Sequence, residues 1–122
     1  MAETWKLTVR SGSLVQTEPF DALGPALDRL EARVDELASE ARRAPTQVFR
    51  REIAPVAQVG VRAELTGPGR LRGRVHAGVD VRGDGSAEAY TGRVRREVVD
   101  QHMGETAVEA LRRALAGEPG AT

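Results

Sequence analysis

An alternation of apolar and polar residues over residues 56–99, interrupted twice by glycine, constrains the fold of this chain more than any other feature. The first apolar positions are Val59, Val61, Ala63 and Leu65. The alternation restarts after Gly67-Pro68-Gly69 and again after the segment 83–86, Gly-Asp-Gly-Ser. A period of two is typical of half-buried strands, and glycine-rich interruptions are typical of hairpin turns. The stretch therefore predicts three consecutive antiparallel strands.

The two turns also predict how these strands pair. A three-residue first loop pairs Val61 with Val75, and a four-residue second loop pairs Val79 with Tyr90. Both counts place apolar side chains on one face, and a slip of one residue would move them all to the other face. The exception is Arg96, which this register places on the apolar face.

On the polar face, the same register collects basic side chains. Arg62, Arg74 and Arg95 fall in one row across the three strands, and His76 and Arg93 fall in the next. Three like charges side by side repel each other unless something anionic or acidic covers them. These five residues are therefore the candidate partner- or anion-binding residues.

The chain begins with a second predicted hairpin. Trp5, Leu7 and Val9 alternate with polar residues, and a turn at residues 11–13 leads into a second strand at 14–17. Because Trp5 shares the parity of Leu7 and Val9, we expect it in the core rather than in a binding site.

A long helix should follow this hairpin, because apolar residues recur at alternating steps of three and four. The stripe comprises Phe20, Leu23, Leu27, Leu30, Val34, Leu37 and Ala41. We expect residues 18–21 to open this helix, Gly24 and Pro25 to serve as cap and first helical residue, and Pro45 to stop it. Its outer side is acidic, which either solvates the helix or faces a basic partner. Those acids are Asp28, Glu31, Asp35, Glu36 and Glu40.

A second amphipathic helix is predicted over residues 105–116, and residues 46–56 fit either a short helical turn or an edge strand. The predicted fold class is α+β: an antiparallel sheet made of the N-terminal hairpin and the three-stranded meander, five strands in all, with two helices packed on one face. We expect a single domain over residues 1–117 and a disordered tail over 118–122.

Composition narrows the function classes. The chain has no cysteine and a net charge of zero, with an acidic front and a basic middle. Lysine occurs once among the 18 basic residues, which is typical of a GC-rich, bacterial coding sequence and weakens any argument from arginine alone. Without a signal peptide or a membrane-spanning apolar run, we expect a cytoplasmic protein that does not bind membranes.

No motif predicts chemistry. The segment 80–86 resembles a calcium loop or an adhesion tripeptide only superficially, since a hairpin turn explains its glycines. His76 and His102 are too few for a metal site, so we expect no metal and no cofactor. In the predicted register Tyr90 and His76 lie on opposite faces, which gives no catalytic group, and we expect no enzyme activity.

These observations favour a non-catalytic interaction or adaptor module that uses the basic sheet face. Its partner would be an acidic protein surface, or a second copy of the chain reached through the acidic helix, giving a homodimer. The alternative is a nucleic-acid-binding domain that reads the phosphate backbone, although the predicted basic face has no aromatic residue for base stacking.

Overall fold

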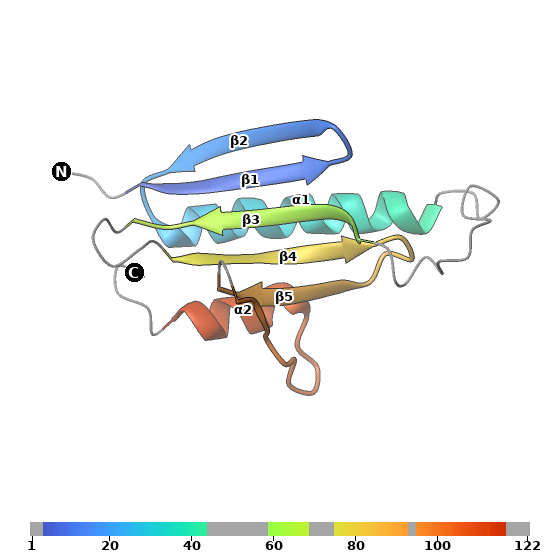
Figure 1. Ribbon diagram of the computed structural model, residues 1–122. Coiled ribbons are helices and arrows are strands. Elements are labelled where there is room, and N and C mark those ends of the chain that lie inside the picture. Colours follow the sequence, from blue (N-terminus) through green and yellow to red (C-terminus); the bar gives the residue numbers. More distant parts are fainter. Residues whose placement is uncertain (1–3, 44–58, 69–74, 93–94, 117–122) are drawn as a thin grey trace.

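The computed structural model describes residues 4–43, 59–68, 75–92 and 95–116. In chain order the elements are β1 (Trp5–Ser11), β2 (Leu14–Phe20), α1 (Leu23–Arg43), β3 (Val59–Thr66), β4 (His76–Arg82), β5 (Ala87–Thr91), β6 (Glu97–Val98) and α2 (Ala107–Leu115). The strands form one antiparallel sheet in the order β2-β1-β3-β4-β5-β6. Figure 1 shows α1 running behind this sheet. The predicted α+β class is confirmed, with six strands in the described residues rather than five.

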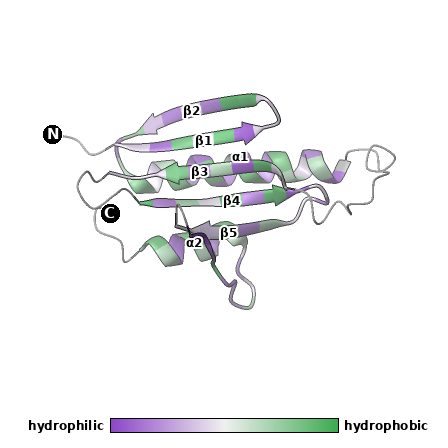
Figure 2. Ribbon diagram, viewed as in Figure 1, coloured by the Kyte–Doolittle hydropathy of each residue, from purple (hydrophilic) through white to green (hydrophobic). Residues whose placement is uncertain are grey.

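The core lies between the sheet and the two helices. Apolar residues alternate with polar ones along the strands (Figure 2), and the apolar ones face α1 and α2. Trp5, Leu7 and Val9 of β1 are buried, as are Leu30 of α1 and Leu111 of α2. The alternation therefore identified the core face of β1, β3 and β4 correctly, including the position of Trp5.

The N-terminal hairpin forms as predicted but is longer. Ser11 pairs with Leu14 around a two-residue loop, in which Gly12 has a φ of 61°. Glycine adopts that left-handed conformation without strain, and at the first loop position it is typical of a type II′ turn. The strand then continues to Phe20, which pairs with Trp5.

The prediction that residues 18–21 open the long helix is therefore wrong, because they belong to β2. The helix α1 begins at Leu23 and includes Gly24 and Pro25 in its first turn. Proline at residue 19 is compatible with a strand because β2 lies at the edge of the sheet, where a missing N–H group costs no ladder bond. Pro45 and the undecided residues 46–56 lie outside the described residues.

The predicted pairing of the first two meander strands is wrong by six residues. Val61 of β3 faces Val81 of β4, not Val75. The pairing continues to Gly67, whose N–H donates to the carbonyl oxygen of Val75 at 2.7 Å. Because six is an even number, the same parity of residues faces the core in both registers, and alternation cannot distinguish them.

The predicted pairing of β4 with β5 is wrong by one residue. Val79 faces Ala89, and Gly78 faces Tyr90. The loop has three residues rather than four: the Arg82 N–H donates to the Ser86 carbonyl at 2.8 Å, and Gly85 adopts a φ of 89°. A slip of one residue inverts the faces, so Tyr90 lies on the polar side of the sheet.

The predicted third strand is interrupted after Thr91. Gly92 has a φ of 100°, and a Cβ there would lie 2.3 Å from the Arg95 carbonyl oxygen, so this tight bend requires glycine. After the bend, the short strand β6 pairs with β5 at the edge of the sheet. The helix α2 forms as predicted, with Thr106 and Glu109 in a capping box at its start. The predicted tail, residues 118–122, lies outside the described residues.

Candidate interaction face

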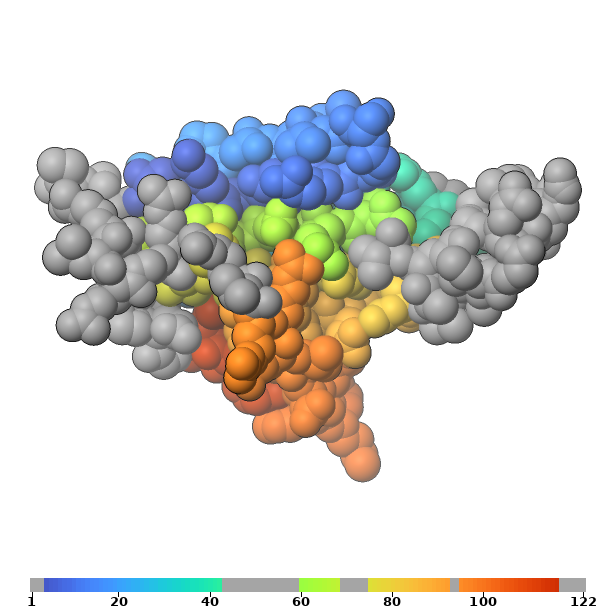
Figure 3. Space-filling model, in the orientation of Figure 1, coloured from blue at the N-terminus to red at the C-terminus, as the bar shows by residue number. Residues whose placement is uncertain are grey.

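The polar side of the sheet, opposite the helices, is called the open face below. Its residues in β1, β3, β4 and β5 include Lys6, Thr8, Arg10, Arg62, Glu64, Thr66, His76, Asp80, Glu88 and Tyr90. Figure 3 views the molecule from this side, and the orange segment that contains β6 lies across it as far as β3, in green. The open face is therefore built by the sheet together with the segment that leads into β6.

Ion pairs connect neighbouring strands on the open face. Arg62 binds Asp80 with two hydrogen bonds, Nε to Oδ1 at 2.6 Å and Nη2 to Oδ2 at 3.1 Å. The hydrogen bond with Asp80 is the main reason that the pKa of Arg62 is raised. Arg10 Nε donates to Glu64 at 2.8 Å, and Arg82 donates to Glu88. Acidic side chains thus lie among the guanidinium groups and hold them in place.

The predicted row of three arginines does not form around Arg62. Its neighbour on β4 is Asp80, because of the six-residue difference in register. Arg95 is exposed in the connection between β5 and β6, and Arg74 and Arg93 lie outside the described residues. The binding role of these residues stays a prediction, without the row on which it rested.

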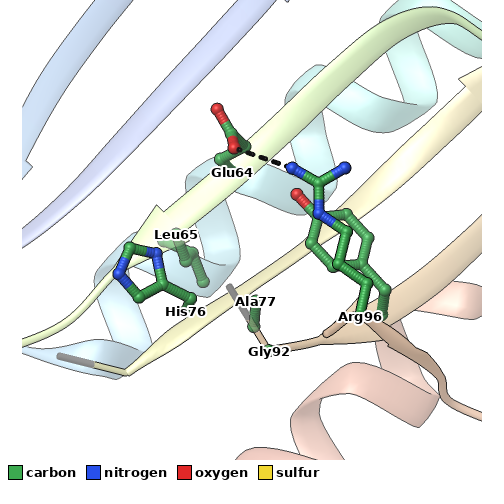
Figure 4. Close-up of a pocket in the computed structure, with 7 residues that line it drawn as sticks. Glu64, Leu65, His76, Ala77, Gly92 and Arg96 are labelled. Carbon is green, nitrogen blue, oxygen red and sulfur yellow. Dashed lines mark ion pairs between the residues drawn. The ribbon is translucent and has the colours of Figure 1, made fainter. Parts of the chain in front are cut away.

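Tyr90 of β5 lies beneath two guanidinium groups of the open face. The Arg62 guanidinium carbon lies 5.6 Å from the centroid of its ring, and that of Arg96 lies 4.9 Å away. Arg96 Nη2 also lies 3.8 Å from Glu64 Oε2. Figure 4 shows Arg96 reaching toward Glu64, with His76 on the same side of the sheet. Although it faces away from the helices, Tyr90 is only 5% exposed.

The placement of Arg96 on the apolar face, and of Tyr90 and His76 on opposite faces, is therefore wrong. The correction for Tyr90 follows from the shorter loop between β4 and β5. The position of Arg96 follows from the bend at Gly92, after which the chain no longer continues β5. A glycine inside a strand often marks a close approach by a neighbouring group, so Gly78 of β4 could have indicated the residue that faces Tyr90. A Cβ at Gly78 would lie 2.6 Å from the Tyr90 hydroxyl.

A small cavity of about 20 Å³ lies beside this tyrosine, with room for about one water molecule. Its lining residues are Glu64, Leu65, His76, Ala77, Tyr90, Gly92 and Arg96. The buried Tyr90 hydroxyl has no hydrogen-bond partner among the described residues. Burial is the main cause that raises the pKa of Tyr90 to about 12, so the phenol stays protonated at neutral pH. The protonated phenol can therefore act as a hydrogen-bond donor beside this cavity.

Two further findings concern the described residues only. They contain no group of three or more His, Asp or Glu side chains placed to hold a metal ion. None of their helices combines the length and apolar character needed to span a membrane.

Comparisons with known proteins give this chain no relatives. No family model, no curated protein and no solved structure matches it.

Proposed function

We propose that this chain is a non-catalytic interaction module that binds an acidic protein surface on its open face. The observation that supports the proposal is the set of guanidinium groups held in fixed positions there, of which Arg10 and Arg96 are the most accessible. Within the described residues Arg10 makes its hydrogen bond through Nε alone, which leaves its other N–H donors for a partner. Fixed side chains lose little conformational entropy when they bind.

A protein partner fits this face better than a nucleic acid. Glu64, Asp80 and Glu88 lie among the arginines, and their carboxylates would repel a continuous phosphate backbone. The tyrosine is covered by guanidinium groups and presents no free ring for base stacking.

The absence of catalysis is part of the same proposal. The cavity beside Tyr90 has room for about one water molecule, which is too little for a substrate. The absence of cysteine leads us to propose that the module acts in the cytoplasm.

The test is a binding titration with two defined probes, an oligoglutamate peptide and a single-stranded oligodeoxynucleotide, each at low and at high salt. We expect the peptide to bind the wild-type chain and the double variant Arg10→Gln with Arg96→Gln to lose at least about tenfold in affinity. The fold should persist in this variant, because exposed ion pairs contribute only about 0–1 kcal/mol each.

The matched control is Arg29→Gln with Arg33→Gln, which removes the same charge from α1, on the other side of the sheet. It should bind the peptide like the wild type. Equal losses in both double variants would mean that only total charge matters and would contradict the proposal. Tighter binding of the oligonucleotide, with a steep salt dependence, would favour the nucleic-acid alternative instead.

A further inference from the structure

The edge strand β2 offers a second binding element, independent of the open face. It has seven residues and, among the described strands, one neighbour, β1, so no described strand pairs with the backbone groups on its outer side. Leu14 and Val15 are 59% and 50% exposed. Natural sheets usually protect such edges with charged residues, bulges or proline, because an open edge can pair with another chain.

The hairpin geometry identifies which backbone groups point outward. A two-residue loop is closed by a hydrogen-bonded pair, here Ser11 with Leu14, and hydrogen-bonded and non-hydrogen-bonded pairs then alternate. The N–H and C=O groups of Val15 and Thr17 therefore point away from β1. Pro19 is the next residue whose backbone faces away from β1, so its missing N–H group leaves the pairing with β1 intact.

Residues 14–17, Leu-Val-Gln-Thr, form the unprotected part of this edge. They carry no charge, and the first charged residue, Glu18, is paired with Arg29 of α1 at 2.9 Å. The chain as a whole has a net charge of zero, so two copies do not repel each other at long range.

We propose that β2 pairs antiparallel with β2 of a second copy, about a two-fold axis at Gln16, and joins the two sheets into one. In this register Val15 of each copy faces Thr17 of the other, and all four outward N–H groups find outward C=O groups. An axis at Thr17 would instead place Val15 opposite Pro19, which has no N–H group to donate.

A second copy satisfies this edge better than an arbitrary strand does. It matches every donor with an acceptor, keeps both proline rings beyond the paired residues, and brings the two exposed Val15 side chains diagonally together. A single strand pair buries less surface than a stable dimer needs, so the expected dimer is weak and depends on concentration.

Cysteine cross-linking tests the register, since the native chain has no cysteine of its own. Gln16 residues at the axis form a non-hydrogen-bonded pair about 4.5 Å apart at Cα, within the range of a disulfide. We expect Gln16→Cys to form a disulfide-linked dimer under mild oxidation. Leu14→Cys is the matched control: it is as exposed, but its two copies would lie roughly 13 Å apart along the strands and should stay unlinked.

Sedimentation of cysteine-free variants provides an independent readout. Val15→Lys should abolish the concentration-dependent dimer, because it places two ammonium groups beside each other at the axis. Thr8→Lys, on the same face but one strand in from the edge, should leave it unchanged. Equal cross-linking at positions 14 and 16, cross-linking at Thr17→Cys in place of Gln16→Cys, or a wild-type chain that stays monomeric at millimolar concentration would each overturn the proposal.

Discussion

Tyr90 shows how a single residue can be buried on the solvent side of a sheet. Neither of the described helices, α1 and α2, covers it; the guanidinium groups of Arg62 and Arg96 lie over its ring instead. Contacts between guanidinium groups and aromatic rings are worth about 0.5–1 kcal/mol at exposed sites and more when they are desolvated. This burial costs free energy at the hydroxyl group, which has no hydrogen-bond partner in the described part of the chain.

This burial predicts a specific loss of stability at alkaline pH. The pKa of Tyr90 is raised to about 12 in the folded chain, compared with about 10 in an unfolded one. Between these values the folded chain retains a proton that the unfolded chain has lost. The contribution of Tyr90 to the free energy of unfolding is therefore fully present below pH 10. It declines, by about 3 kcal/mol in total, as the pH rises through 12.

Ultraviolet absorbance can follow this titration directly, because Tyr90 is the only tyrosine. We expect a midpoint well above 10 in the folded protein, and we expect Tyr90→Phe to remove this part of the alkaline dependence. A folded-state midpoint near 10 would show that the phenol is solvated.

At the scale of an element, the strand β4 depends on close approach at Gly78. A Cβ at that position would lie 2.5 Å from the Ala63 carbonyl oxygen and 2.6 Å from the Tyr90 hydroxyl. Both are far shorter than van der Waals contact, so the paired strands would have to separate.

Gly78→Ala should therefore destabilise the fold by about 1–3 kcal/mol, as measured by chemical denaturation. Gly60→Ala is the matched control on β3, since the nearest atom to its Cβ, the Val81 carbonyl oxygen, is 3.7 Å away. Its cost should be small. Equal losses for the two variants would contradict the position of Tyr90 over Gly78.

The elements themselves were largely predictable from the sequence, whereas the pairing of the strands was not. Period-two alternation located the core face of β1, β3 and β4, and three-and-four spacing located both helices. Alternation cannot fix a register that differs by an even number of residues, as with Val61 and Val81. It also depends on the assumed loop length, and one residue too many between β4 and β5 placed Tyr90 on the wrong face.

At the scale of the whole molecule, α1 and α2 share one face of the sheet and contact each other. We expected the acidic side of α1 to be solvated or to face a basic partner. Part of it instead binds a basic residue of the same chain, since Arg112 of α2 donates to Asp28 at 2.8 Å and to Glu31 at 3.2 Å. No periodicity in the sequence relates residues so far apart along the chain. Leu111, next to Arg112, is completely buried against the core.

The expected losses of stability indicate which contact of α2 matters most for holding it on the sheet. Leu111→Ala should cost about 2–5 kcal/mol, because it leaves a cavity in the core. Arg112→Ala should cost about 1 kcal/mol or less, because its ion pairs are partly exposed. Thermal melts of the two variants check this order. A larger loss for Arg112→Ala would mean that charge, rather than apolar burial, fixes the second helix.

The two faces of the sheet each carry one natural optical probe. Trp5, the only tryptophan, is completely buried on the helix side, and the only tyrosine lies on the open side. Their fluorescence and absorbance signals therefore report separately on the core and on the open face. Coincident unfolding curves from the two chromophores are the signature of a single cooperative unit, so this small sheet contains its own test of two-state behaviour without any added label.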